Sequence, residues 1–168
     1  MADTGYNQMV MELTLLGLAD IDPHGKVFPE LALEVPTIEN GGVVVDEASG
    51  KMDVTWKLRQ DIKWSDGKPL TTADVLFTWE ALTNPETGIW AEGVDYTDSL
   101  EKVDDYTFII HYSSIYPGYA TQLGGENMAI YPSHYCDAAA GFVAWNCNQQ
   151  VLGAGPYVLD EWVTGDHL

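Results

Sequence analysis

The feature that most constrains the fold is an alternating stretch in the first half of the chain. From Met52 to Leu58, apolar residues occupy every second position and polar residues lie between them. This period of two places one face of a strand on a core and the other face in water. Residues 43–45 form another apolar run, and turn-forming residues at 46–50 separate the two. We therefore predict a β-hairpin over residues 43–58.

The residues that follow predict a tight turn and then an amphipathic helix. Asp66-Gly67 favours the turn. Thr71 is suited to cap the helix, and Asp74 lies three residues later, near the positive end of the helix dipole. We expect the helix to end near Leu82, before Pro85. Three of its apolar residues recur at helical spacing and should face the core: Val75, Trp79 and Leu82.

The rest of the chain predicts short elements joined by turns. Apolar runs and turn residues indicate a helical turn at 29–32, a hairpin formed by 99–103 and 106–112, a short helix at 117–123, and strands at 128–131 and 157–162. We therefore expect an α+β fold with a mixed or antiparallel sheet, hairpins and a few helices. No run of about 18 apolar residues predicts a membrane span.

Charge excludes some partners. The chain has 26 Asp and Glu against 7 Lys and Arg, a net charge of −19. Nucleic-acid binding is not expected, because it needs clustered cations to neutralise phosphates. The same reasoning argues against an anionic membrane surface. Two interpretations of the acidic surface stay open: a solvated face that keeps the protein soluble, and a docking face for a cationic partner.

Motifs for catalysis are missing from the sequence. It contains no Gly-x-Ser-x-Gly, no phosphate-binding Gly-x-x-x-x-Gly-Lys and no His-Glu-x-x-His. His24 and His134 lie in turns beside proline and are interpreted as surface residues, and His111 lies on the polar face of a predicted strand. We therefore expect no enzyme, no catalytic residue, no metal site and no cofactor.

Tryptophan and cysteine supply the remaining candidates for a site. Trp56, Trp79 and Trp162 fall at periodic core positions, whereas Trp64, Trp90 and Trp145 lie in or near loops where they could line a ligand cleft. The chain's two cysteines, Cys136 and Cys147, lie eleven residues apart. Their spacing leaves two interpretations open, a disulfide across a loop and two buried free thiols.

Four segments resemble one known family. The run from Trp56 to Glu80, WKLRQDIKWSDGKPLTTADVLFTWE, resembles the signature stretch of family 5 extracellular solute-binding proteins. These are the oligopeptide-, dipeptide- and nickel-binding receptors of ABC importers. Residues 16–32, 103–108 and 153–157 resemble further family motifs in the same order, with Ala154 where the family has threonine. The resemblance covers roughly residues 10–165.

The resemblance implies an incomplete domain of the periplasmic-binding-protein type II-like fold. Family members are much longer and bind a ligand between two lobes. We therefore expect an N-terminal fragment, residues 1–168, that forms a single partial domain. It would contain the start of the first lobe, a small inserted subdomain at about 27–150 and a return to the first lobe from about 153. Trp90 follows the Asn84–Gly88 turn and is the nearest candidate for ligand binding.

The resemblance also implies a function in transport. We expect a monomeric substrate-binding component of an ABC importer, which binds peptides or related small solutes outside the cytoplasmic membrane and delivers them to permease subunits. It would lie in the periplasm or be lipid-anchored at the outer face of that membrane. The first residues do not form a signal peptide, so we expect either a cut chain or a cytoplasmic one. Two alternatives remain: a structural or interaction subdomain that binds nothing small, and a nickel-chelate or oligosaccharide binder.

Overall fold

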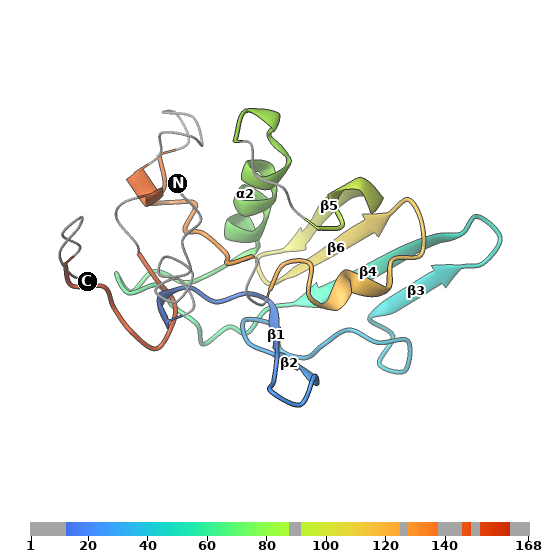
Figure 1. Ribbon diagram of the computed structural model, residues 1–168, viewed down its shortest axis with the longest axis horizontal. Coiled ribbons are helices and arrows are strands. Elements are labelled where there is room, and N and C mark those ends of the chain that lie inside the picture. The colour runs from blue at the N-terminus through green and yellow to red at the C-terminus, as the bar shows by residue number, and fades with distance from the viewer. Residues whose placement is uncertain (1–12, 88–91, 125–127, 138–145, 149–151, 162–168) are drawn as a thin grey trace.

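The computed structural model describes residues 13–87, 92–124, 128–137, 146–148 and 152–161. Within these residues, helix α2 stands beside a four-stranded sheet, and a two-stranded hairpin lies below it (Figure 1). The bounds are β1 (Ala19–Ile21), β2 (Val27–Pro29), β3 (Val43–Asp46), β4 (Lys51–Lys57), α2 (Thr72–Thr83), β5 (Thr97–Asp104) and β6 (Thr107–Tyr112). Short 3₁₀ turns lie at Pro85–Thr87, Val94–Tyr96, Pro117–Ala120 and Asn146–Asn148.

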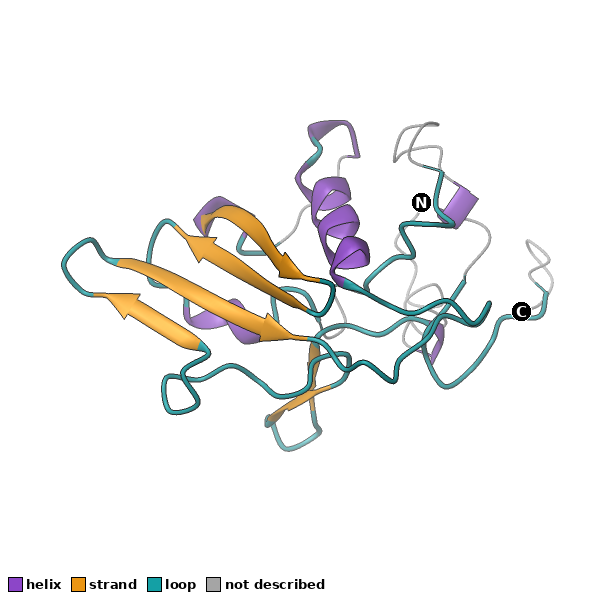
Figure 2. Cartoon of the chain, turned by 180° about the vertical axis from the view of Figure 1, so that it is seen from behind, coloured by secondary structure: helices purple, strands orange, loops and turns teal. Residues whose placement is uncertain are grey.

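The larger sheet is antiparallel, with strand order β3-β4-β6-β5 (Figure 2). Both of its hairpins, β3–β4 and β5–β6, are formed by the segments whose patterns predict them. Gly50 has a φ of 70° in the first turn, a conformation that glycine adopts without strain. The expected α+β fold with an antiparallel sheet is therefore confirmed.

One face of this sheet forms the centre of the core. Alternate residues of β4 and β6 are almost fully buried: Met52, Val54, Trp56, Phe108, Ile110 and Tyr112. Leu18, Leu31, Leu70 and Ile130 belong to the same cluster. The residues between the buried positions face outward, so the period of two in the sequence sets the two sides of the sheet.

Helix α2 has the start and the buried face that the sequence predicts. The backbone N–H of Thr71 donates to the Asp74 carboxylate at 2.9 Å. The N–H of Thr72 donates to the carbonyl of Asp105 at 2.8 Å, which fixes the helix beside the β5–β6 turn. Val75 and Leu82 are buried, and Trp79 is partly buried against the same core. Among the described residues, no helix has the length and hydropathy needed to cross a bilayer.

Two of the expected helical segments differ from the structure. Residues 29–32 form no helical turn, because β2 pairs with β1 and Ala32 then forms an isolated bridge with Leu58. The segment 117–123 contains only the 3₁₀ turn Pro117–Ala120. The physical reason for the first error is the nearby hairpin partner, whose backbone groups compete with a local helical turn.

Two of the expected strands are also wrong. Residues 128–131 are buried or partly buried but form no strand. The N–H of Ile130 donates to Leu16 and that of Tyr131 to the Thr78 hydroxyl, so no single partner strand receives them. Residues 157–161 likewise form no strand, although the N–H of Tyr157 donates to the Leu13 carbonyl at 3.2 Å.

Candidate functional site

Asp74 is the centre of a buried polar cluster at the start of α2. Asp74 is only 2% exposed. Besides the N–H of Thr71, it accepts hydrogen bonds from the backbone N–H of Ser133 at 2.8 Å, the Ser133 hydroxyl at 2.7 Å and the Trp64 indole at 3.4 Å. These donors and the helix N-terminus stabilise a carboxylate that would otherwise be costly to bury. The cluster joins three segments: the signature turn, which contains Trp64, Asp66 and Gly67, the start of α2, and the segment around Ser133.

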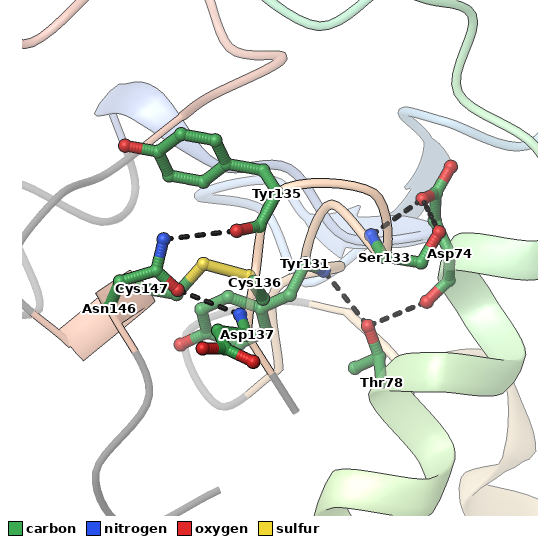
Figure 3. Close-up of a disulfide and its surroundings, with 9 residues drawn as sticks. All are labelled: Asp74, Thr78, Tyr131, Ser133, Tyr135, Cys136, Asp137, Asn146 and Cys147. Atoms are coloured by element: carbon green, nitrogen blue, oxygen red, sulfur yellow. Dashed lines mark hydrogen bonds between the residues drawn. A yellow bond between two sulfur atoms is a disulfide. The ribbon is translucent and has the colours of Figure 1, made fainter. Parts of the chain in front are cut away.

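A second contact lies one helical turn further along α2. The Thr78 hydroxyl donates to the Asp74 carbonyl at 2.8 Å and accepts the Tyr131 N–H at 2.9 Å (Figure 3). Figure 3 also shows that Ser133 and Tyr131 reach the helix from the same loop. Side chains of α2 therefore hold residues 131–133 in place where no sheet partner does.

The loop then continues into a disulfide. Cys136 and Cys147, for which the sequence left two interpretations open, are joined with their Cα atoms 5.3 Å apart (Figure 3). Asn146 accepts the Asp137 N–H at 2.8 Å and donates to the Tyr135 carbonyl at 3.0 Å. The cysteines are buried in a small cluster with Ala81 of α2. The covalent link and these bonds hold the two ends of the loop on the helix.

The tryptophans that the sequence considers for a ligand cleft divide into two groups. Trp64 is 2% exposed and belongs to the core, so the cleft interpretation of this residue is wrong. The physical reason is that its indole N–H has a buried partner in Asp74, which lets the whole ring leave water. Trp90, the ligand-binding candidate, and Trp145 lie outside the described residues.

A shallow surface pocket of about 100 Å³ lies between the β2–β3 connection and the outer face of β4. Asn40 shapes its rim, because its side-chain oxygen accepts the N–H groups of Thr37 and Gly42 at 2.8 and 3.0 Å. Glu34 and Lys57 contribute the charged groups of the lining. Pockets that enclose a drug-sized ligand measure roughly 300–1,000 Å³. This pocket is therefore too small to enclose a peptide.

The histidines and acids do not assemble into a metal centre within the part of the chain that the structure describes. His24 is exposed, as the sequence suggests. His134 is more constrained than a free surface residue, since its Nε2 lies 2.9 Å from an Asp66 oxygen and its ring lies edge-on to Trp64. Backbone N–H donation from Lys68, followed by the contact with His134, lowers the pKa of Asp66. This pair connects the signature turn to the loop that bears the disulfide.

Sequence reasoning identifies Asp74 as a helix-start residue but misses its partner Ser133. The two residues are 59 positions apart, and a single serine after a proline carries no signal of such a contact. Chemically, the Asp74 carboxylate is surrounded by donors: the Ser133 hydroxyl, the backbone N–H groups of Thr71 and Ser133, and the Trp64 indole. This arrangement indicates a rigid support between a sheet, a helix and a loop.

Comparison with known proteins agrees with this scaffold. The model of the bacterial extracellular solute-binding proteins, family 5 Middle, matches residues 26–168. The periplasmic oligopeptide-binding protein OppA of Haemophilus influenzae is 24% identical over an alignment of 181 positions. The alignment covers 88% of this chain and 33% of that protein.

Solved structures show the same fold. The oligopeptide-binding protein from Thermus thermophilus, complexed with a pentapeptide, superposes with a TM-score of 0.75 at 22% identity, over 97% of this chain and 32% of the other. NikZ from Campylobacter jejuni, in complex with Ni(L-His), gives 0.74 at 25% identity, over 93% and 29%. The fold is thus part of a type II periplasmic binding protein, and the chain spans about a third of the length of these relatives. The family match extends over most of the sequence, and the chain therefore belongs to the bacterial extracellular solute-binding proteins of family 5.

Proposed function

We propose that the protein is the substrate-binding component of an ABC importer and that it binds peptides outside the cytoplasmic membrane. The family match over residues 26–168 is the observation that carries this proposal. The similarity to an oligopeptide-binding protein of Haemophilus influenzae favours peptides over other solutes. A disulfide is consistent with an oxidising compartment outside the cytoplasm, where such bonds persist.

The meeting of the described ends of the chain supports a proposed division into a lobe and a subdomain. We propose that residues of about 27–150 form a small inserted subdomain and that the chain returns to the first lobe from about 153. The N–H of Gly155 donates to the Thr14 carbonyl at 2.8 Å, and the N–H of Tyr157 donates to the Leu13 carbonyl at 3.2 Å. Figure 1 places both ends on the same side of the molecule, away from β3. This arrangement supports a lobe that the chain leaves to form the subdomain and then re-enters.

The proposed mechanism is non-covalent. Because the chain spans about a third of the length of its relatives, we infer that a ligand is held between this lobe and a second lobe of a longer polypeptide. Closure of the lobes would surround an extended peptide, with polar groups binding its main chain and hydrated pockets accepting varied side chains. The closed monomer would then present its ligand to permease subunits at the membrane.

Calorimetry on the protein at its natural length tests the peptide assignment. Mixed tripeptides to pentapeptides should release or absorb heat with saturable one-to-one binding. The nickel–histidine chelate and a short oligosaccharide are titrated in the same way as alternative ligands. Saturable binding of the chelate or the sugar without any peptide response would contradict the assignment.

Two alternative functions predict different outcomes of this calorimetry. The similarity to NikZ, whose structure holds Ni(L-His), favours a nickel-chelate binder if the chelate alone binds. A structural or interaction subdomain would give no heat with any solute. Tryptophan fluorescence separates these cases further, because an indole in the ligand cleft responds to ligand and an indole in the core does not.

Trp90 is the proposed aromatic contact to the ligand. Replacing it (Trp90→Ala) should weaken peptide binding by roughly tenfold, which corresponds to about 1.4 kcal/mol of binding free energy. Tyr96→Ala is the control, since Tyr96 is a half-exposed aromatic that the resemblance does not assign to the ligand. Equal affinities of the Trp90→Ala variant and the unaltered protein would exclude Trp90 as a contact.

A further inference from the structure

His111 lies between two carboxylates on the outer face of the four-stranded sheet. It belongs to β6, whose neighbours are β4 on one side and the edge strand β5 on the other. Its Nδ1 is 2.8 Å from an Asp53 oxygen on β4, and its Nε2 is 3.1 Å from a Glu101 oxygen on β5. One imidazole ring therefore connects three strands through side chains alone.

The protonation state of the ring decides whether both contacts are attractive. An ionised carboxylate only accepts hydrogen bonds, and a neutral imidazole has one N–H and one lone pair. With neutral His111, one carboxylate would face the lone pair and lose its donor. With the imidazolium form, both nitrogens donate and the positive charge lies between two negative ones. The geometry is thus that of a protonated histidine.

The edge strand beside this contact is irregular. The pairing of β5 with β6 shifts between Thr97 and Ser99 and again between Lys102 and Asp104. Such irregularities disrupt the ladder locally and leave fewer regular hydrogen bonds. Glu101 lies in the regular stretch between the two shifts. The contact between His111 and Glu101 therefore adds a side-chain link to β5 within the regular stretch between the two shifts.

Other charged groups near His111 come from both neighbouring strands. On β4, Lys51 lies on the same outer face, and on β5 the carboxylate of Asp98 pairs with the Lys51 ammonium at 3.0 Å. This ion pair is neutral overall. The groups that face His111 directly are the carboxylates of Asp53 and Glu101.

We propose that His111 is a proton-binding clamp that fastens the edge strand β5 to the body of the sheet when its ring is protonated. Hydrogen bonding to Asp53 raises its pKa, burial partly opposes this, and the bond to Glu101 raises it further. A raised pKa in the folded state means that the clamp stabilises the sheet below the usual histidine pKa, about 6.5. The stabilisation is lost as the pH rises through the pKa of the folded protein.

NMR titration of the histidine ring protons tests the pairing. In the unaltered chain, His111 should titrate above the usual histidine pKa. Asp53→Asn and Glu101→Gln should each lower the pKa of His111, because each removes one negative acceptor. Asp98→Asn is the matched control: it removes an acid from β5 that faces Lys51 instead of the ring. An unchanged pKa in both test variants, or an equal decrease in the control, would overturn the proposal.

Amide hydrogen exchange tests the effect on the strand. After correction for the intrinsic pH dependence of exchange, protection of β5 amides should decrease from pH 6 to pH 8 by a larger factor than protection of β3 amides. His111→Gln should remove this difference, and so should Glu101→Gln, which serves as a second, milder variant. Equal decreases for β5 and β3 in the unaltered chain would contradict a clamp, as would a difference that persists in both variants.

Discussion

At the scale of single residues, Asp74 shows how one side chain serves both local and distant structure. Its position at the start of α2 follows from the sequence, because Thr71 and the spacing to it indicate a helix N-terminus. Its bonds to Ser133 and Trp64 do not follow, since nothing local specifies which distant donors will reach it. Local electrostatics is thus readable from the sequence, whereas the choice of a remote partner depends on the complete fold.

Replacing this carboxylate should destabilise the protein strongly. Asp74→Ala leaves the buried donors of Ser133 and Trp64 without their acceptor. Hydrogen bonds to charged groups contribute about 1.5–3 kcal/mol each, so we expect the free energy of unfolding to fall by roughly 2–4 kcal/mol. Urea denaturation followed by tryptophan fluorescence measures the change.

The control for this variant is Asp61→Ala. Asp61 is an exposed acid whose carboxylate pairs with Arg59, and an ion pair in water adds little to stability. The control should leave the urea midpoint nearly unchanged. Similar midpoints for the two variants would show that the Asp74 cluster does not support the fold.

Buried tyrosines predict an alkaline limit to stability. Burial raises the pKa of Tyr131 to about 12, and burial also raises that of Tyr112, whose hydroxyl donates to Gln122. The unfolded chain therefore releases these protons at lower pH than the folded chain does. Stability should thus decrease as the pH rises above about 10. Denaturation midpoints from pH 8 to 11 measure this, and Tyr131→Phe should reduce the slope; a flat profile above pH 10 would contradict the burial of these hydroxyls.

At the scale of elements, local patterns specify the hairpins and α2 well. Each of these elements closes through residues near in sequence, so alternation, turn residues and a cap suffice to predict it. The apolar runs at 128–131 and 157–161 lack such local partners. Their backbone groups bond to Thr78, Leu16 and Leu13, which lie far along the chain, and no strand forms. Apolar residues alone indicate burial there, but they do not fix the type of element.

The disulfide loop provides the prediction at this scale. Alkylation of the unreduced protein should modify neither cysteine, and alkylation after reduction should add two groups to the mass. Cys136→Ser with Cys147→Ser should lower the free energy of unfolding by about 2–3 kcal/mol, as closure of an 11-residue loop suggests. Thermal denaturation with and without reductant measures the loss. Modification of both thiols before reduction would contradict the bond.

At the scale of the whole molecule, the resemblance in the sequence predicted the family and the fold class, which the comparisons confirm. It does so because the signature residues form the scaffold itself: the hairpin, the tight turn and the start of α2. The signature residues do not identify the ligand site in the same way. The chain spans about a third of the length of its relatives, and the pocket next to β4 is too small to enclose a peptide. Residues that build a scaffold identify the family, but ligand specificity depends on the surfaces that face the bound solute.

The most direct test of the account is a crystal structure of the natural-length protein with the peptide that binds it most tightly. The account predicts that residues of about 27–150 form the inserted subdomain, that Asp74 and Ser133 remain joined, and that the peptide lies between two lobes. A peptide enclosed within residues 27–150 alone, or a ligand bound with no second lobe contacting it, would contradict the central claim.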